Sequence, residues 1–269
     1  MQRPMLSHDE RQLVLYEWNS RTADYPTDRC LHHLVEEQAE LRPDAPAVRC
    51  GADRLTYGQL NARANQLARF LASHSGVQPQ TLVALCVQRS LDMVVAILGI
   101  FKAGAAFLPI SPVYPRERVA FLLKDSGAPI LLTQKALRDG LPGFSGETLC
   151  LEDIAAQLDQ HDPKNPAAAV TATDLAYVIY TSGSTGAPKA ALLEHRGTYN
   201  AAVAHIAACG VRPEDRLLQF AAFGFDGAII ESLMALGAGA ELVLVPQDQL
   251  LLGEPLATML LENGITMAT

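Results

Sequence analysis

The sequence lacks several features that would assign it to other classes of protein. Its five cysteines are scattered and form no C-x-x-C pair, so we expect no metal cluster or disulfide framework, and reduced thiols fit a cytoplasmic protein. Lys and Arg number 21 against 29 Asp and Glu, an acidic balance that argues against a nucleic-acid-binding surface. The longest relevant apolar run, 93–101, is too short to span a bilayer, and the first residues lack the apolar stretch of a secretion signal. We therefore expect neither nucleic acid nor a membrane as a partner.

The chain has enough apolar residues for one large domain or two subdomains, since they make up 49% of its 269 residues. Helix-like and strand-like segments alternate, which predicts an α/β fold with mostly parallel sheets flanked by helices. Helices are expected at about 57–73, 90–103, 115–127, 197–209, 227–236 and 255–263. Strands are expected at 81–87, 106–109, 130–133, 175–181, 190–193, 217–220 and 242–245, with an opening strand at 265–269.

A polar, proline-broken stretch at 161–173 is typical of a linker. It divides the chain into a first α/β subdomain, 30–160, and a second, 174–269. No internal repeat or low-complexity tract is present.

The segment Tyr180–Lys189 reads Y-T-S-G-S-T-G-A-P-K and follows an apolar strand-like run. Its glycines let successive backbone N–H groups point into one concavity, and its hydroxyls and Lys189 add donors and charge, which favours binding of phosphate oxygens. A Walker loop is excluded, because Ala187 and Pro188 separate Gly186 from the lysine, and the G-x-G-x-x-G dinucleotide pattern is absent. A flexible surface turn is the alternative interpretation. The adjoining strand and the lysine favour a phosphate loop.

Further segments accompany this loop in a defined order. They are L-T-Y-G-Q-L at 55–60, F-K-A-G-A-A-F-L-P at 101–109, E-H-R-G at 194–197 and F-D at 225–226. Together with the loop they resemble adenylate-forming enzymes, most of all the amino-acid adenylation domains of non-ribosomal peptide synthetases. The resemblance spans nearly the whole chain, and residues 1–29 are similar to the linker that precedes such domains.

The resemblance implies the fold of the large N-terminal domain of adenylate-forming enzymes, with its C-terminal part missing and its second subdomain truncated. It also implies ATP as a substrate, held by the loop through its β and γ phosphates. The implied nucleotide-binding residues are Thr181, Ser182, Gly183, Ser184, Thr185, Gly186 and Lys189. Among these, Thr185 and Lys189 are the candidate catalytic residues, because hydrogen-bond donors near the departing pyrophosphate stabilise the transition state most. The ligands of Mg²⁺ are expected beyond the end of the chain.

Asp226 is the candidate partner for the ammonium group of an amino acid, because a carboxylate beside apolar walls pairs strongly with a cation. Phe225, Ile229 and Ile230 are the expected walls. A helix N-cap is the alternative role for this aspartate. The resemblance favours substrate binding and adds Gly227, Ile230 and Thr269 as residues that face the substrate side chain.

The function implied by the resemblance is ATP-dependent activation of an amino acid as aminoacyl-AMP. The acyl group would then pass to the phosphopantetheine thiol of a peptidyl carrier domain, with neighbouring synthetase domains as further partners. Two alternatives stay open: a ligase that activates another carboxylic acid for transfer to coenzyme A, or a non-catalytic fragment that binds nucleotide weakly. We expect the chain to be an incomplete fragment that is inactive alone.

Several other residues have simpler expected roles. His195 and Arg196 are expected to be solvated or to cap the following helix. His32 and His33 lack companions at ligand spacing, so no metal role is expected. Trp18 is expected to pack. Ala190 stands where relatives have glycine, which would cost about 1 kcal/mol if that residue had a positive φ.

Overall fold

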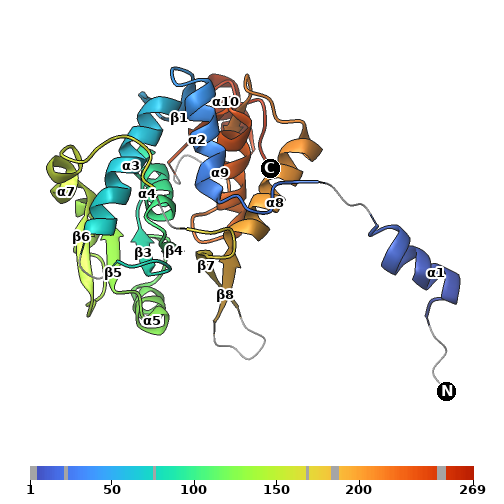
Figure 1. Ribbon diagram of the computed structural model, residues 1–269, viewed down its shortest axis with the longest axis horizontal. Coiled ribbons are helices and arrows are strands. Elements are labelled where there is room, and N and C mark those ends of the chain that lie inside the picture. Colours follow the sequence, from blue (N-terminus) through green and yellow to red (C-terminus); the bar gives the residue numbers. More distant parts are fainter. Residues whose placement is uncertain (1–4, 21–23, 75–76, 168–169, 183–187, 247–252) are drawn as a thin grey trace.

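The computed structural model describes residues 5–20, 24–74, 77–167, 170–182, 188–246 and 253–269 as an α/β fold (Figure 1). The helices are α1 (His8–Gln12), the π-helix η1 (Leu13–Glu17), α2 (Leu31–Leu41), α3 (Tyr57–Ser73), α4 (Leu91–Lys102), α5 (Arg116–Ser126), α6 (Lys135–Arg138), α7 (Leu151–Leu158), α8 (His195–Cys209), α9 (Asp226–Ala238) and α10 (Glu254–Glu262). The strands are β1 (Pro46–Cys50), β2 (Asp53–Thr56), β3 (Leu82–Cys86), β4 (Ala106–Pro109), β5 (Ile130–Thr133), β6 (Glu147–Cys150), β7 (Leu175–Thr181), β8 (Lys189–Glu194), β9 (Arg216–Leu218) and β10 (Glu241–Leu244).

The strands form two mostly parallel sheets, which confirms the predicted fold class. Six strands lie in the order β6-β5-β3-β4-β7-β8, where β7 and β8 are antiparallel and the other pairs are parallel. Four strands lie in the order β2-β1-β10-β9, where β1 and β2 are antiparallel. Each helix and strand predicted between residues 57 and 263 is present, with bounds that shift by a few residues.

The sheets do not divide at the predicted linker, 161–173. β7 and β8 follow that stretch yet complete the sheet of β3 and β4, whereas β1 and β2 precede it yet pair with β10. The stretch is also fastened to α3: Asn65 donates to the carbonyl of Pro163 at 2.7 Å, and Arg69 donates to those of Asp162 and Lys164, each at 3.1 Å. The division into subdomains 30–160 and 174–269 therefore stays a prediction. Its boundary does not coincide with the boundary between the two sheets, because each sheet contains strands from both ranges.

The helix α3 forms where the sequence supplies both a start signal and an apolar stripe. Thr56 and Gln59 make a reciprocal capping box at its N-terminus. Leu60, Leu67 and Leu71, at helical spacing, are all fully buried.

The helix α4 is apolar on all sides, and ten of its twelve residues are buried, as expected for a helix enclosed by other elements. It approaches α3 closely, because a Cβ on Gly99 would lie 2.8 Å from a side-chain carbon of Leu67. No helix within the described residues is long and apolar enough to cross a membrane.

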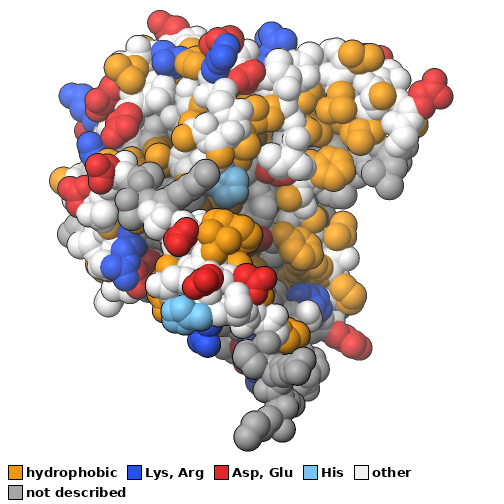
Figure 2. All heavy atoms as spheres, turned by 90° about the vertical axis from the view of Figure 1, so that its right-hand side faces the viewer, with side chains coloured by type: hydrophobic (Ala, Val, Ile, Leu, Met, Phe, Trp, Pro, Cys, Tyr) orange, Lys and Arg blue, Asp and Glu red, His pale blue; other side chains and the backbone are white. Residues whose placement is uncertain are grey.

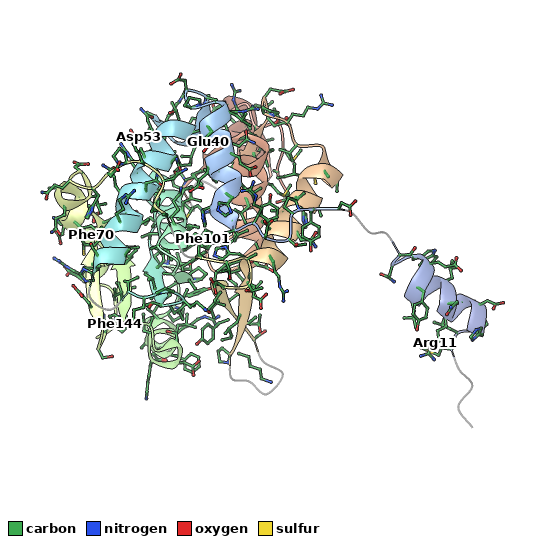
Figure 3. The ribbon with its side chains drawn as sticks, in the orientation of Figure 1. Arg11, Glu40, Asp53, Phe70, Phe101 and Phe144 are labelled. Atoms are coloured by element: carbon green, nitrogen blue, oxygen red, sulfur yellow. The ribbon has the colours of Figure 1, made fainter. Side chains whose placement is uncertain are left out.

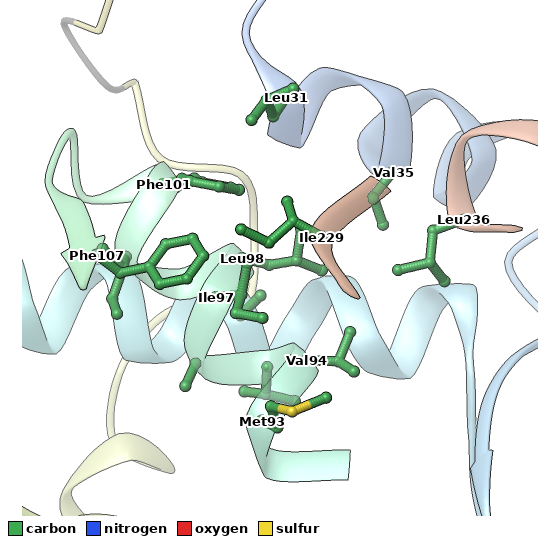
Figure 4. Packing of buried hydrophobic residues seen from close by; sticks show 14 of the residues in the cluster. Leu31, Val35, Met93, Val94, Ile97, Leu98, Phe101, Phe107, Ile229 and Leu236 are labelled. Atoms are coloured by element: carbon green, nitrogen blue, oxygen red, sulfur yellow. The ribbon is translucent and has the colours of Figure 1, made fainter. Parts of the chain in front are cut away.

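One apolar core joins the two sheets. It contains Leu85 of β3 and Leu242 of β10, both fully buried. Figure 4 shows Ile229 of α9 packed beside Ile97 and Leu98 of α4. Because helices from both halves of the sequence share this core, the sheets are held as one body.

A buried ion pair, between Lys102 and Glu36, lies beside this core. Lys102, 1% exposed, ends α4, and its Nζ pairs with the carboxylate of Glu36 on α2 and donates to Asn61 Oδ1 at 2.8 Å and Asn165 Oδ1 at 3.3 Å. Burial lowers the pKa of Lys102, and the Glu36 carboxylate opposes that shift. The pairing satisfies an ammonium group that would otherwise be costly to bury.

The N-terminal helices lie away from the rest of the fold (Figure 1). None of the residues of α1 or η1 is buried, and Figure 3 places Arg11 far from Phe101 in the middle of the molecule. The expected packing role of Trp18 is wrong, since 66% of that residue is exposed. A short segment with few contacts to a core has nothing to bury its aromatic ring against.

Tyr57 links α3 to the end of α9. It is fully buried, and its hydroxyl lies 2.8 Å from the carbonyl oxygen of Ala240 and 3.1 Å from that of Leu236. These carbonyls lie at the end of α9, where backbone acceptors lack helical partners.

Replacing Tyr57 with Phe should destabilise the fold by about 1–3 kcal/mol, because buried carbonyls lose their donor. Chemical denaturation monitored by circular dichroism measures the change in the free energy of unfolding. Tyr16→Phe is the matched control, since Tyr16 is 63% exposed. Equal free energies of unfolding for Tyr57→Phe and the parent chain would contradict this role of the hydroxyl.

Candidate functional site

The predicted phosphate loop begins at the end of β7 and ends at the start of β8, and these two strands pair as a hairpin. Most of β7 is buried within the six-stranded sheet, but Thr181 and Ser182 at its end are exposed. Thr181 pairs with Lys189 across the hairpin, and its Oγ1 donates to the Lys189 carbonyl at 3.4 Å. The structure therefore brings both ends of the loop together in a position open to solvent.

Four of the predicted nucleotide-binding residues lie outside the described residues: Gly183, Ser184, Thr185 and Gly186. Their roles stay predictions, as do those of Thr181, Ser182 and Lys189. Ala190 does not incur the cost of a positive φ, because it pairs with Tyr180 in the β8 ladder and is not among the described residues that have a positive φ.

A cavity of about 700 Å³ opens beside this hairpin. Its walls come from β7, β8, α8, the first turns of α9 and the last residue, Thr269. Its lining includes four of the residues that the sequence predicted for a substrate pocket, namely Asp226, Gly227, Ile230 and Thr269. The structure thus brings together side chains that are far apart in the sequence, although what binds there stays a prediction.

Helical periodicity explains the wall that α9 supplies. Gly227, Ile230, Glu231 and Met234 all line the cavity, and they stand at positions i, i+3, i+4 and i+7 of one helical face. The first two were predicted from the sequence, whereas Glu231 and Met234 were not, although the same spacing could have indicated them. Tyr177 of β7 was missed for a different reason: strand alternation does not show which face borders a cavity.

Asp226 is the first residue of α9, and Phe225 occupies the N-cap position. The Asp226 carboxylate is exposed and accepts a hydrogen bond from the neighbouring Gly227 N–H at 2.9 Å. The alternative role as N-cap is therefore wrong by one position. A carboxylate in the first turn still interacts favourably with the helix dipole and stays available to a cation in the cavity.

Two of the three apolar walls expected around Asp226 are not walls. Ile229 is 2% exposed and packs into the main core, as Figure 4 shows, and Phe225 is 58% exposed outside the cavity lining. Only Ile230 faces the cavity, because neighbouring helical residues point about 100° apart.

Glu231 is a buried carboxylate in the cavity wall, with only 4% of the residue exposed. It accepts hydrogen bonds from the Ala221 N–H at 3.0 and 3.2 Å and from the Thr269 hydroxyl at 2.7 Å. Burial raises its pKa, while these donors and the Arg89 charge act in the opposite direction. The hydroxyl of Thr269 is thus held in place by Glu231. The stretch 265–269 was expected to be a strand, but it makes only a single β-bridge, from Met267 to Leu217.

His195 was expected to be solvated or to cap the following helix, and it does neither, because Glu194 occupies the N-cap position. It is the first residue of α8 and fully buried, and its Nδ1 accepts the Leu31 N–H at 3.3 Å. Burial lowers the pKa of His195 to about 4, so the ring is neutral at pH 7. Arg196 is exposed, as expected, and pairs with Glu194 at 2.6 Å. The two residues therefore do not act as a pair.

The structure also brings His32 and His33 within 4.8 Å of Glu36, counted between possible ligand atoms. This grouping was not predicted, although spacings of three and four residues on one helix could have indicated it. His33 Nδ1 accepts the Cys30 N–H at 2.9 Å, and Glu36 is paired with Lys102. Because two of the three ligands are already engaged, the group makes a poor metal site.

On the face shown in Figure 2, the Lys and Arg side chains of the described residues are scattered among acidic and apolar ones. All five cysteines are free thiols.

Several known proteins are similar to this chain. The profile of AMP-binding enzymes matches residues 35–269. A linear gramicidin synthase of Brevibacillus parabrevis is 47% identical over 262 residues, which cover 97% of this chain and 5% of that synthase. The non-ribosomal peptide synthetase FmoA3 bound to alpha-methyl-L-serine-AMP superposes with a TM-score of 0.86 at 31% identity, over 98% of this chain and 29% of the other. Its AMPPNP-bound form gives a TM-score of 0.78 at 33% identity, over 87% and 24%. The chain spans only a small part of the length of each of these proteins.

The buried, neutral His195 predicts a pH dependence of stability. Its pKa is about 4 when folded and 6.5 ordinarily, so the unfolded chain takes up the proton first as the pH falls. This contribution is complete above pH 6.5 and is lost between about pH 6.5 and 4. The full loss is about 3 kcal/mol, because a tenfold change in proton affinity corresponds to about 1.4 kcal/mol.

The test compares the chain with His195→Asn, whose Oδ1 can still accept the Leu31 N–H but does not titrate. Urea denaturation at pH 7 and at pH 4 should show that the variant loses less stability than the parent chain on acidification. His8→Asn, at an exposed residue of α1, is the control for loss of an imidazole. Parallel losses in the parent chain and His195→Asn would rule out a neutral His195.

Proposed function

Because the chain belongs to the AMP-binding enzyme family, we propose that it is the N-terminal part of an amino-acid adenylation domain of a non-ribosomal peptide synthetase. In the proposed reaction, the carboxylate of an amino acid attacks the α-phosphorus of ATP. Aminoacyl-AMP forms, and pyrophosphate leaves. The FmoA3 neighbours, solved with AMPPNP and with alpha-methyl-L-serine-AMP, support this choice of substrates.

The observation that carries the proposal is the position of Asp226. Its carboxylate lies at the cavity that β7 borders, and the same strand leads directly into the phosphate-loop sequence. An amino acid in this cavity could pair its ammonium group with Asp226 while its own carboxylate faces the triphosphate. Such fixed orientation contributes much of the rate enhancement when two anionic groups must meet.

The loop residues are proposed to bind the triphosphate of ATP. Thr181, Ser182, Lys189 and the backbone amides between them would donate to the β and γ phosphates. Charge develops on the departing pyrophosphate, so donors fixed there lower the barrier most. Thr185 and Lys189 are the proposed catalytic residues. Mg²⁺, which would screen the phosphate charges, is expected to be held by residues beyond 269.

The cavity wall suggests the kind of amino acid. Gly227 adds no side chain, and Ile230 adds apolar surface, so we propose a medium or bulky apolar side chain. Thr269 would contribute the third contact. The acyl group would then pass to the phosphopantetheine thiol of a peptidyl carrier domain, next to other synthetase domains in the cytoplasm.

Two other functions would use the same fold. A ligase for another carboxylic acid would bind ATP in the same way and transfer its product to coenzyme A, but it would need no anionic partner for an ammonium group. The Asp226 carboxylate at the cavity disfavours it. The third possibility is that this chain, taken alone, only binds nucleotide weakly and catalyses nothing.

We also propose that this chain alone is inactive. It covers only 29% of the FmoA3 chain, and the expected magnesium ligands would lie outside it.

Asp226→Asn should raise the KM for the amino acid about 10- to 100-fold, because a charged hydrogen bond contributes about 1.5–3 kcal/mol. ATP–pyrophosphate exchange, measured on a C-terminally extended chain against a panel of amino acids, gives this KM. Asp139→Asn, at an exposed residue after α6 and outside the cavity lining, is the control. Unchanged amino-acid dependence in Asp226→Asn would favour the ligase of another carboxylic acid.

The fragment proposal has a separate test. The 269-residue chain should give no exchange above background, while the C-terminally extended chain should exchange with at least one amino acid. Robust exchange by the short chain would show that no essential group is missing from it.

A further inference from the structure

The segment Gln219–Ala221, which follows β9 and leads toward Asp226, is held on its carbonyl side by Arg89. Arg89 follows β3 in the other sheet, and its guanidinium donates to three successive carbonyls. Nη1 donates to Gln219 at 2.9 Å, and Nη2 donates to Phe220 at 2.8 Å and to Ala221 at 2.5 Å. The planar fork of an arginine suits converging acceptors, which a lysine cannot match.

The same segment is held on its amide side by Glu231. This carboxylate, on α9, accepts the Ala221 N–H with both oxygens. Ala221 is therefore bonded through its carbonyl to a cation and through its N–H to an anion. Neither group is part of the reaction proposed above.

Both charged groups are partly or fully removed from water. Burial lowers the pKa of Arg89 and raises that of Glu231, and the attraction between the two charges opposes both shifts. A charge held in such a place is stabilised by its specific partners, so loss of one group leaves the other poorly satisfied.

The segment Gln219–Ala221 packs directly against residues that line the cavity. A Cβ built on Gly227 would lie 3.3 Å from the Ala221 Cβ, so Ala221 packs behind the cavity wall. Glu231 reaches the cavity a second way, through the hydroxyl of Thr269 at 2.7 Å. A shift of Ala221 would therefore move the residues around Asp226. Within the described part of the chain, the β7–β8 hairpin makes no hydrogen bond to this segment.

We propose that Arg89 and Glu231 are positioning residues that clamp Gln219–Ala221 and thereby fix the amino-acid cavity, while leaving the ATP site unaffected. This inference rests on the proposed function for its kinetic consequence but not for its structural one.

The kinetic test uses Arg89→Met and Arg89→Lys in the C-terminally extended chain. Arg89→Met should raise the KM for the amino acid at least tenfold and change the KM for ATP less than twofold. Arg89→Lys, which keeps the charge without the fork, should give an intermediate KM. Arg54→Met, at an exposed residue of β2, is the matched control. Equal increases in both KM values, or no increase in either, would overturn the proposal.

A structural test does not depend on activity. Hydrogen exchange by mass spectrometry of the 269-residue chain should show faster exchange over residues 219–231 in Arg89→Met and in Glu231→Gln, with α3 unchanged. If Arg89→Met does not fold, Arg89→Lys and Glu231→Gln carry the test. Exchange equal to that of Arg54→Met in this segment would overturn the clamp. If the extended parent chain activates no amino acid, the proposed function fails, and hydrogen exchange alone decides the clamp.

Discussion

Burial of one face of α9 is the constraint on which the candidate site depends. Ile229 and Leu236 enter the core that joins the two sheets, where each buried side chain contributes about 1.5–3 kcal/mol. When this face is buried, a different face of α9 points to the cavity, and Gly227 and Ile230 lie on that face. The position of Asp226 at the start of the helix follows from the same packing. Apolar contacts that take no part in chemistry thus decide where the polar groups meet.

The two sheets contribute different halves of the site, and the contacts between them therefore matter as much as the residues that line it. The six-stranded sheet carries the β7–β8 hairpin and its loop, while the segment after β9 leads to Asp226. Arg89, which follows β3 in the six-stranded sheet, bonds across this junction to backbone carbonyls that follow β9. Backbone acceptors at strand and helix ends have no regular partners, so a few side chains from the opposite sheet can hold them in place.

Much of this fold could be predicted from local patterns, and the exceptions share a cause. Local patterns predicted α3 and α4, which the structure has at Tyr57–Ser73 and Leu91–Lys102. The pairing of β1 with β10 could not be predicted, because strand patterns do not specify distant partners. Ile229 was assigned to the wrong face, and His195 was expected to be solvated or to cap α8, because motif order does not report burial. The cavity residues that motifs predicted do lie together, whereas Glu231 was not predicted, although its spacing from Gly227 places it on the same helical face.

In the proposed function, the cavity takes an amino acid while the hairpin loop takes the triphosphate of the same reaction. A crystal structure of the C-terminally extended chain with an activated amino acid and AMPPNP would decide whether it does. We expect the ammonium nitrogen at hydrogen-bond distance from the Asp226 carboxylate and the phosphates between Thr181 and Lys189. Ligand density that leaves the cavity empty, or a nucleotide bound away from the hairpin, would refute this arrangement.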